Sequence, residues 1–176
     1  MGNGEPIVAY IDDQLIECDR KNLLQPPSFP NPPLWGIARK RLKAVTPDCP
    51  LQDPYILGIM IALGQEKLLA RRKAIAKQQG RSQGCQVSLK DLEVTPQVLF
   101  TSRSDTDNVY LYRAQISYHT LQMFRYPKQA PPSTTPPIEI EANKIPLRPF
   151  CTLNARLCAS IAPGVTLTMS REDMAR

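Results

Sequence analysis

The stretch Asp53–Gln79 reads DPYILGIMIALGQEKLLARRKAIAKQQ, and it joins a helix start to a long apolar run. Asp53 is a favourable N-cap, and Pro54 fits the first helical position, where no backbone N–H is needed. Six large apolar residues between positions 56 and 63 cover nearly every side of such a helix, so its first half should be buried on several faces. We therefore predict a central helix of about 25 residues, about 37 Å long.

The second half of this predicted helix is basic. Six basic residues and no acidic residue lie between positions 67 and 81: Lys67, Arg71, Arg72, Lys73, Lys77 and Arg81. Such a basic stripe can neutralise phosphates and make binding sensitive to salt. Basic residues also stabilise a helix C-terminus and often form a solvated face. The basic stripe is thus a candidate surface for nucleic acid or for a protein partner.

Two β-rich runs follow the helix, at Gln97–Thr101 and Val109–Ile116. The alternation of the second run places four residues on one face: Tyr110, Tyr112, Ala114 and Ile116. The polar segment Ser102–Asn108 predicts a longer hairpin loop between the runs. Ser117 can cap a short helix that Pro127 prevents from continuing.

The C-terminal part predicts one more strand and one more helix. Ile138–Glu141 alternates apolar and acidic residues, as an edge strand does. A helix that starts near Thr152 and ends at Gly164 would carry three apolar residues on one face: Leu153, Leu157 and Ile161.

The N-terminal part is harder to assign. Pro6–Cys18 predicts a hairpin, because two aspartates in its middle suit a tight turn. Residues 25–33 contain five prolines and predict an extended connection. Trp35 is expected to anchor the return of the chain to the core. Arg39–Lys43 forms a short basic cluster on a helical turn or two.

Together these elements predict a single α+β domain over residues 1–165. Its mainly antiparallel sheet packs on one long central helix, with short additional helices. A composition of 42% hydrophobic and 22% charged residues suits a folded domain. The 18 prolines predict irregular connections, above all near 25–33 and 131–137, and residues 166–176 predict a flexible tail.

Three segments read DPYILGIMIALGQ at Asp53–Gln65, NVYLYRAQISYHTLQMFRYP at Asn108–Pro127, and RPFCTLNARL at Arg148–Leu157. Their order and content resemble small proteins of filamentous fungi that have no established chemistry. The resemblance extends over about the last two-thirds of the chain. It implies that the three segments pack as one unit, and it implies no activity.

Nucleophilic catalysis needs a Ser or Cys beside a base that a third group orients. The chain has one histidine, His119, and lacks the GxSxG and Walker patterns. Cys151 or Cys158 could meet His119 in space, but small helix-packing residues are the simpler interpretation.

Clustered carboxylates with a nearby lysine can hold a divalent ion in a nuclease site. The residues that could form such a site are Asp105, Asp107, Glu139, Glu141 and Lys144. Turn chemistry and the outward face of a strand explain these carboxylates more simply. We therefore predict no catalytic residue, no metal site and no cofactor.

The five cysteines are widely spaced and form no CxxC pair, so neither a disulfide framework nor a zinc site is expected. Free thiols fit a reducing compartment. No apolar stretch reaches the ~18 residues that a membrane span needs. These features predict an intracellular protein, cytoplasmic or nuclear, that does not insert into membranes.

The poor catalytic inventory favours a non-enzymatic protein-interaction or adaptor role with an unidentified protein partner. A net charge of +6 permits an alternative, a nucleic-acid-associated protein that uses the basic stripe. An enzyme with an unrecognised site is the third interpretation. The sequence leaves the oligomeric state and the strand order open.

Overall fold

A computed structural model of the chain describes residues 8–25, 32–79, 92–128, 132–133 and 135–162. Its strands are β1 (Ala9–Asp12), β2 (Glu93–Val94), β3 (Gln97–Ser102), β4 (Asp105–Ala114), β5 (Ile116–Ser117) and β6 (Ile140–Pro146). Its α-helices are α1 (Asp13–Leu24), α2 (Pro32–Val45), α3 (Pro54–Gln79), α4 (Tyr118–Arg125) and α5 (Leu153–Ile161). Short 3₁₀ turns cover Pro50–Gln52 and Phe150–Thr152. The predicted α+β class is confirmed.

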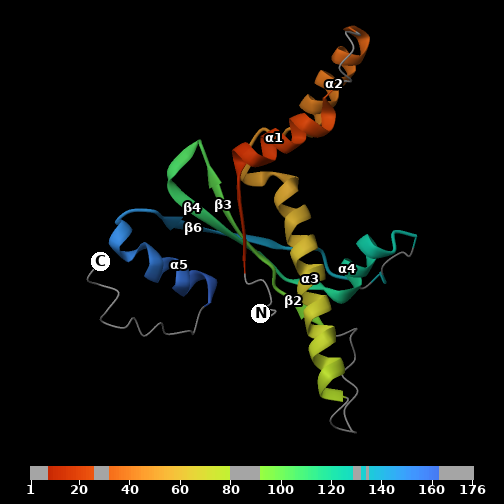
Figure 1. Cartoon of the computed structure of the whole chain (residues 1–176), viewed down its shortest axis with the longest axis vertical. Helices are drawn as coiled ribbons and strands as arrows, with labels where there is room; N and C mark the ends of the chain where they lie inside the picture. The colour runs from red at the N-terminus through yellow and green to blue at the C-terminus, as the bar shows by residue number, and fades with distance from the viewer. Residues whose placement is uncertain (1–7, 26–31, 80–91, 129–131, 134, 163–176) are drawn as a thin grey trace.

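The main sheet has the strand order β1-β3-β4-β6 (Figure 1). β3 and β4 form the predicted antiparallel hairpin, but the longer loop predicted at Ser102–Asn108 is wrong, because β4 already begins at Asp105 and only Arg103 and Ser104 join the two strands. β6 pairs antiparallel with β4. β1 runs parallel to β3, so the sheet is mixed but mainly antiparallel. A separate two-stranded sheet joins β2 to β5.

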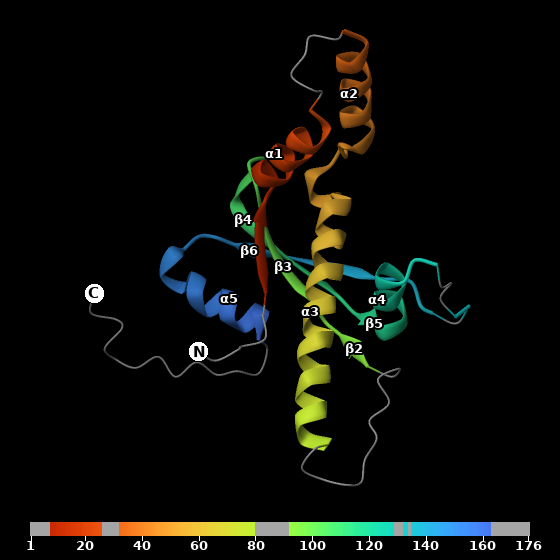
Figure 2. The same cartoon turned by 45° about the vertical axis from the view of Figure 1, so that its right-hand side comes forward.

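Helix α3 covers one face of the main sheet (Figure 2). Its Ile56 and Met60 are buried, Met60 completely, in one cluster with Phe100 of β3 and Tyr112 of β4. Asp53 accepts a hydrogen bond from the backbone N–H of Tyr55 at 2.9 Å and so caps the helix. The predicted long central helix is confirmed.

Helix α5 lies on the opposite face of the sheet (Figure 1). Its Leu157 and Ile161 pack against Val109 and Leu111 of β4 and Ile145 of β6. Alternate side chains of β4 therefore pack into two separate cores, because successive side chains of a strand point to opposite faces. The predicted C-terminal helix is confirmed, and two of the three residues of its predicted stripe, Leu157 and Ile161, pack on the sheet, whereas Leu153 is not part of this cluster.

The hairpin predicted for Pro6–Cys18 is wrong. β1 ends at Asp12 and α1 begins at Asp13, and β1 pairs with β3 instead of with its own neighbour in sequence. The side chain of Asp12 accepts from the backbone N–H of Leu15 at 2.7 Å, so it acts as an N-cap rather than as a turn residue. Ile16 therefore lies on helix α1, and its side chain is buried in the core beneath α3.

The extended connection predicted near 25–33 falls mostly on residues 26–31, which lie outside the described part of the chain. α2 already begins at Pro32 and runs to Val45, so it is much longer than the turn or two expected at Arg39–Lys43. The predicted tail 166–176 and part of the segment 131–137 also lie outside the described residues. The domain limits stay a prediction.

A buried ion pair joins α1 to the start of α3. The Arg20 guanidinium contacts both carboxylate oxygens of Asp53 at 2.7 Å, and the two side chains are 13% and 6% exposed. Beside this pair, the Tyr55 hydroxyl donates to Asp19 at 3.2 Å. The residue that caps α3 therefore also fixes the position of α1.

This pair generates a prediction for stability. Arg20→Met leaves the Asp53 carboxylate buried without its cation, and the free energy of unfolding should fall by about 3 kcal/mol. Adding Asp53→Ser removes the orphan charge and keeps a capping oxygen, so it should restore more than half of the loss. Urea unfolding of both variants measures this, and equal stabilities of the single and double variants would contradict it.

The two glycines of α3 generate a second prediction. A Cβ at Gly64 would lie 3.1 Å from Cδ2 of the buried Leu121 on α4, whereas a Cβ at Gly58 would meet nothing within 4 Å. Gly58→Ala should therefore raise the free energy of unfolding by about 0.5–1 kcal/mol through helix propensity. Gly64→Ala should gain less stability or lose some. If chemical denaturation gives both variants the same gain in the free energy of unfolding, the close approach of α3 and α4 is refuted.

Candidate interaction site

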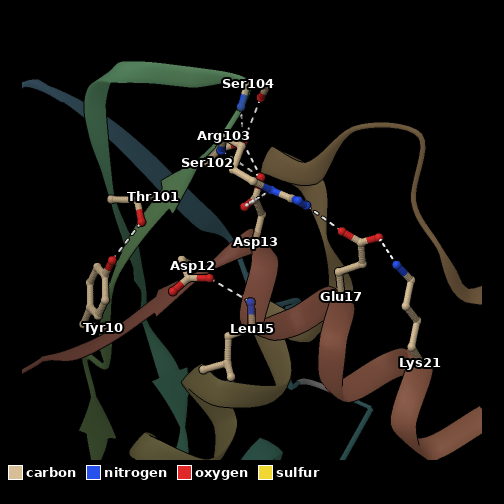
Figure 3. Close-up of polar contacts among 10 residues, drawn as sticks. All are labelled: Tyr10, Asp12, Asp13, Leu15, Glu17, Lys21, Thr101, Ser102, Arg103 and Ser104. Atoms are coloured by element: carbon tan, nitrogen blue, oxygen red, sulfur yellow. Dashed lines mark hydrogen bonds and ion pairs between the residues drawn. The ribbon is translucent and has the colours of Figure 1, made fainter.

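The start of α1 is fixed by the turn between β3 and β4 (Figure 3). The Asp13 carboxylate accepts from the Ser102 hydroxyl and from the backbone N–H of Arg103, both at 2.9 Å. Partial burial raises the pKa of Asp13, but these hydrogen bonds outweigh it and hold the pKa below its usual value. α1 is therefore held at its first turn by a carboxylate that stays charged.

One turn later, Glu17 lies between two cations (Figure 3). It accepts from Lys21 of the same helix and from Arg103, each at 2.5 Å. These hydrogen bonds, first the one from Lys21 and then the one from Arg103, lower the pKa of the Glu17 carboxyl to about 2. The described part of α1 is thus fixed from two sides, by Arg103 and by Asp53.

Helix α2 contacts α1 and projects beyond it, away from the main sheet, in both Figure 1 and Figure 2. None of its 14 residues is buried. Trp35 is 56% exposed, and Ile37 and Val45 are about half exposed. The expectation that Trp35 anchors the chain to the core is therefore wrong, because Pro32 and Pro33 begin a helix that leaves the core.

A groove of about 590 Å³ lies between α1 and α2. It is mostly apolar and is lined by Lys21, Leu24, Gln25, Pro32, Trp35, Gly36, Ala38, Arg39 and Leu42. A Cβ at Gly36 would meet nothing within 4 Å, so the groove is open above this residue. We call this feature the α1–α2 groove.

The charge of α2 has a single sign. Its sequence PPLWGIARKRLKAV contains four basic residues and no acidic residue. The four cations, Arg39, Lys40, Arg41 and Lys43, are exposed and form no ion pair with any residue that the structure describes. An apolar groove with an unneutralised basic helix as one wall suits a partner with apolar and acidic groups.

The basic stripe of α3 is divided by the structure. Lys67 and Arg71 donate to the backbone carbonyls of Thr95 and Glu93, at 3.3 and 2.7 Å, and so hold the segment around β2. Arg72 lines a smaller pocket of about 280 Å³ between α3 and α4, and Lys73 is exposed. Lys77 belongs to α3, but its side chain, like all of Arg81, lies outside the described part.

Of the carboxylates considered for a metal site, Asp105 makes its contacts within the sheet. Asp105 accepts from Tyr110, Asn108 and Lys144, the last at 3.1 Å, and these contacts hold its pKa well below the usual range. Asp107, Glu139 and Glu141 do not join it. Within the described ranges, no group of three or more His, Cys, Asp or Glu could hold a metal ion.

The remaining nucleophile candidates are not brought together either. The His119 ring packs edge-on against the ring of Tyr118, with centroids 5.7 Å apart. The Cys158 thiol donates to the Asn154 side chain at 3.3 Å, and Cys151 is exposed on the turn before α5. Among the described residues neither thiol contacts the imidazole, so the contact considered from the sequence gains no support.

Comparison of the chain with protein-family models, with curated proteins and with solved structures gives no match. The resemblance to fungal proteins therefore stays a prediction. None of the helices in the described part is long and apolar enough to span a membrane.

Sequence reasoning missed the α1–α2 groove, although a signal was present. Trp35, Arg39 and Leu42 are spaced by four and three residues, as one face of a helix requires. The proline-rich run before them favoured an extended connection and concealed this spacing.

The Glu17 contacts predict a dependence of stability on pH. Because the folded pKa of about 2 is below the usual value of 4.5, the contribution of Glu17 is present above pH 4.5 and is lost as the pH falls toward 2. Glu17→Gln should therefore flatten this part of the pH profile of the urea midpoint. Glu66→Gln, an exposed change on α3, is the control, and equal profiles for the two variants would contradict the prediction.

Proposed function

We propose that this chain is a non-enzymatic interaction protein that docks a segment of another protein in the α1–α2 groove. One observation carries the proposal: α2 buries none of its residues, and it exposes Trp35 on the wall of an apolar groove.

The energetics of an isolated helix support this function. A 14-residue helix is near the length below which helices in water are marginal, about 12–15 residues, unless tertiary packing stabilises them. Among the described elements, α1 is the one with which α2 makes extensive contacts. A bound partner would supply the missing burial.

The residue types at the groove support the same function. Tryptophan and arginine are enriched among the residues that carry most of the binding energy in protein interfaces. Trp35 and Arg39 lie one helical turn apart on the wall of the groove. Contiguous exposed apolar surface with a polar rim is also typical of interaction sites.

The alternative, nucleic-acid binding through the basic stripe, receives less support. Lys67 and Arg71 contact backbone carbonyls of the chain itself, so their donors are partly used. A salt series with duplex RNA tests it: Arg72→Ala with Lys73→Ala should leave any binding unchanged if the stripe is a solvated helix face.

The proposed function is tested with a matched pair of glycine variants. Gly36→Gln places a side chain in the open groove, whereas Gly58→Gln places the same side chain on α3, where a Cβ also meets nothing. Both variants should fold, and we expect only Gly36→Gln and Trp35→Ala to lose the partner that the wild-type chain captures from the cells that express it.

The captured protein is then purified and titrated against all four forms. Loss of affinity by at least tenfold in Gly36→Gln and Trp35→Ala, with Gly58→Gln unchanged, supports docking in the groove. A partner that binds all four forms equally, or recovery of the chain alone, would refute it.

A further inference from the structure

Resting on this proposed function, we infer that the partner segment in the α1–α2 groove is an acidic amphipathic helix. The juxtaposition that carries the inference is an apolar groove that is lined by one cation on each helix, Lys21 and Arg39, and by no carboxylate, on a helix α2 that has four cations and no acidic residue.

The charges at the groove favour a partner segment of negative charge. Arg39 of α2 and Lys21 of α1 both line it, so cations lie on both walls. Lys21 already contacts Glu17, whereas Arg39 has no ion pair with a residue that the structure describes. Carboxylates on the flanks of a partner would meet these cations, and complementary charge steers association and fixes its register.

The same charges argue against a second copy of the chain as the occupant. Two α2 helices packed together would bring together two helices that each have four cations and no acidic residue. Like charges at such short separations oppose association. A partner of opposite charge has no such penalty.

The geometry selects a helix rather than an extended strand. A peptide that binds as a β-strand needs free backbone donors and acceptors from its receptor, and these come from sheet edges. The walls of the groove are two helices, whose interior backbone groups are already paired. A helix satisfies its own backbone, so it can dock by side chains alone.

The spacing on α2 suits the apolar stripe of such a helix. Trp35, Arg39 and Leu42 recur at intervals of four and three residues, and they line one wall over about two helical turns. Two apolar side chains of the partner, one or two turns apart, would enter beside Trp35 and Leu42. Its acidic side chains would then lie next to Arg39.

A membrane surface fits less well. Arg41 lies four residues from both Ile37 and Val45, so a cation interrupts the exposed apolar side of α2 outside the groove. An interfacial helix buries an unbroken apolar face in the lipid. A flat bilayer also cannot enter a concave groove, so anionic vesicles are used as a comparison in the test.

The experiment uses the full chain and a displayed library of 14-residue helical peptides. The apolar stripe of each peptide is kept as Leu or Ile, while the flanking positions are randomised among Glu, Gln and Lys. Selection on the wild-type chain is compared with selection on Gly36→Gln. We expect peptides rich in Glu to be enriched on the wild-type chain and not on the blocked groove.

Trp35 then reports the binding of individual peptides, because it is the only tryptophan in the sequence. A peptide without aromatic residues should shift the emission of Trp35 to shorter wavelength as the ring leaves water. The Glu-rich form should bind at least about tenfold more tightly than the Lys form, which corresponds to about two exposed ion pairs. Added salt should reduce this difference.

Charge reversal completes the test. Arg39→Glu should shift the selection toward Lys-rich peptides, whereas Lys73→Glu makes the same change at an exposed position of α3 and should not. Duplex RNA and vesicles of phosphatidylserine with phosphatidylcholine are titrated with the same Trp35 signal, and we expect weaker responses than to the Glu-rich peptide.

The outcomes separate the inference from the function on which it rests. Enrichment of neutral or Lys-rich peptides on the open groove alone would overturn the acidic partner and keep the docking function. Equal enrichment on wild type and Gly36→Gln, or none on either, would overturn both. A Trp35 response to vesicles or RNA that exceeds the response to every peptide would also overturn both.

Discussion

The ion pair between Arg20 and Asp53 is the contact on which the arrangement of this protein depends. Asp53 caps α3, the helix that covers one face of the sheet, and its carboxylate also holds the guanidinium of α1. A charge this well buried needs its partner, since leaving it alone in the interior is costly. The direction of α1 is thereby tied to the start of α3 and, through α3, to the core.

The position of the α1–α2 groove follows from that tie. Asp13 and Glu17 fix α1 to the β3–β4 turn, and Arg20 fixes it to α3, so its outer end projects from the domain. Among the described elements, α2 makes its extensive contacts with α1, and none of its residues is buried. The exposed apolar side chains of α2 are thus a consequence of how α1 is anchored.

Local sequence patterns predict part of the fold. The apolar run after Asp53, the alternation of β4 and the stripe Leu157–Ile161 each match the period of the element that they form, and each was predicted correctly. The segment around Asp12 was misassigned, because an aspartate suits a turn and a helix N-cap equally well. Its role was settled by β3, which lies more than 80 residues away and pairs with β1.

The sequence by itself determined the α+β class, the long helix, the hairpin and the helix after Thr152, because these depend on periodicity and capping within short windows. The sequence also contained the basic stripe, but it did not determine which of those cations would contact backbone carbonyls in and beside β2. Only the tertiary structure decided that Trp35 is exposed and that α1 and α2 enclose a groove. Both depend on the direction in which one helix leaves the core, and contacts between residues distant in sequence set that direction.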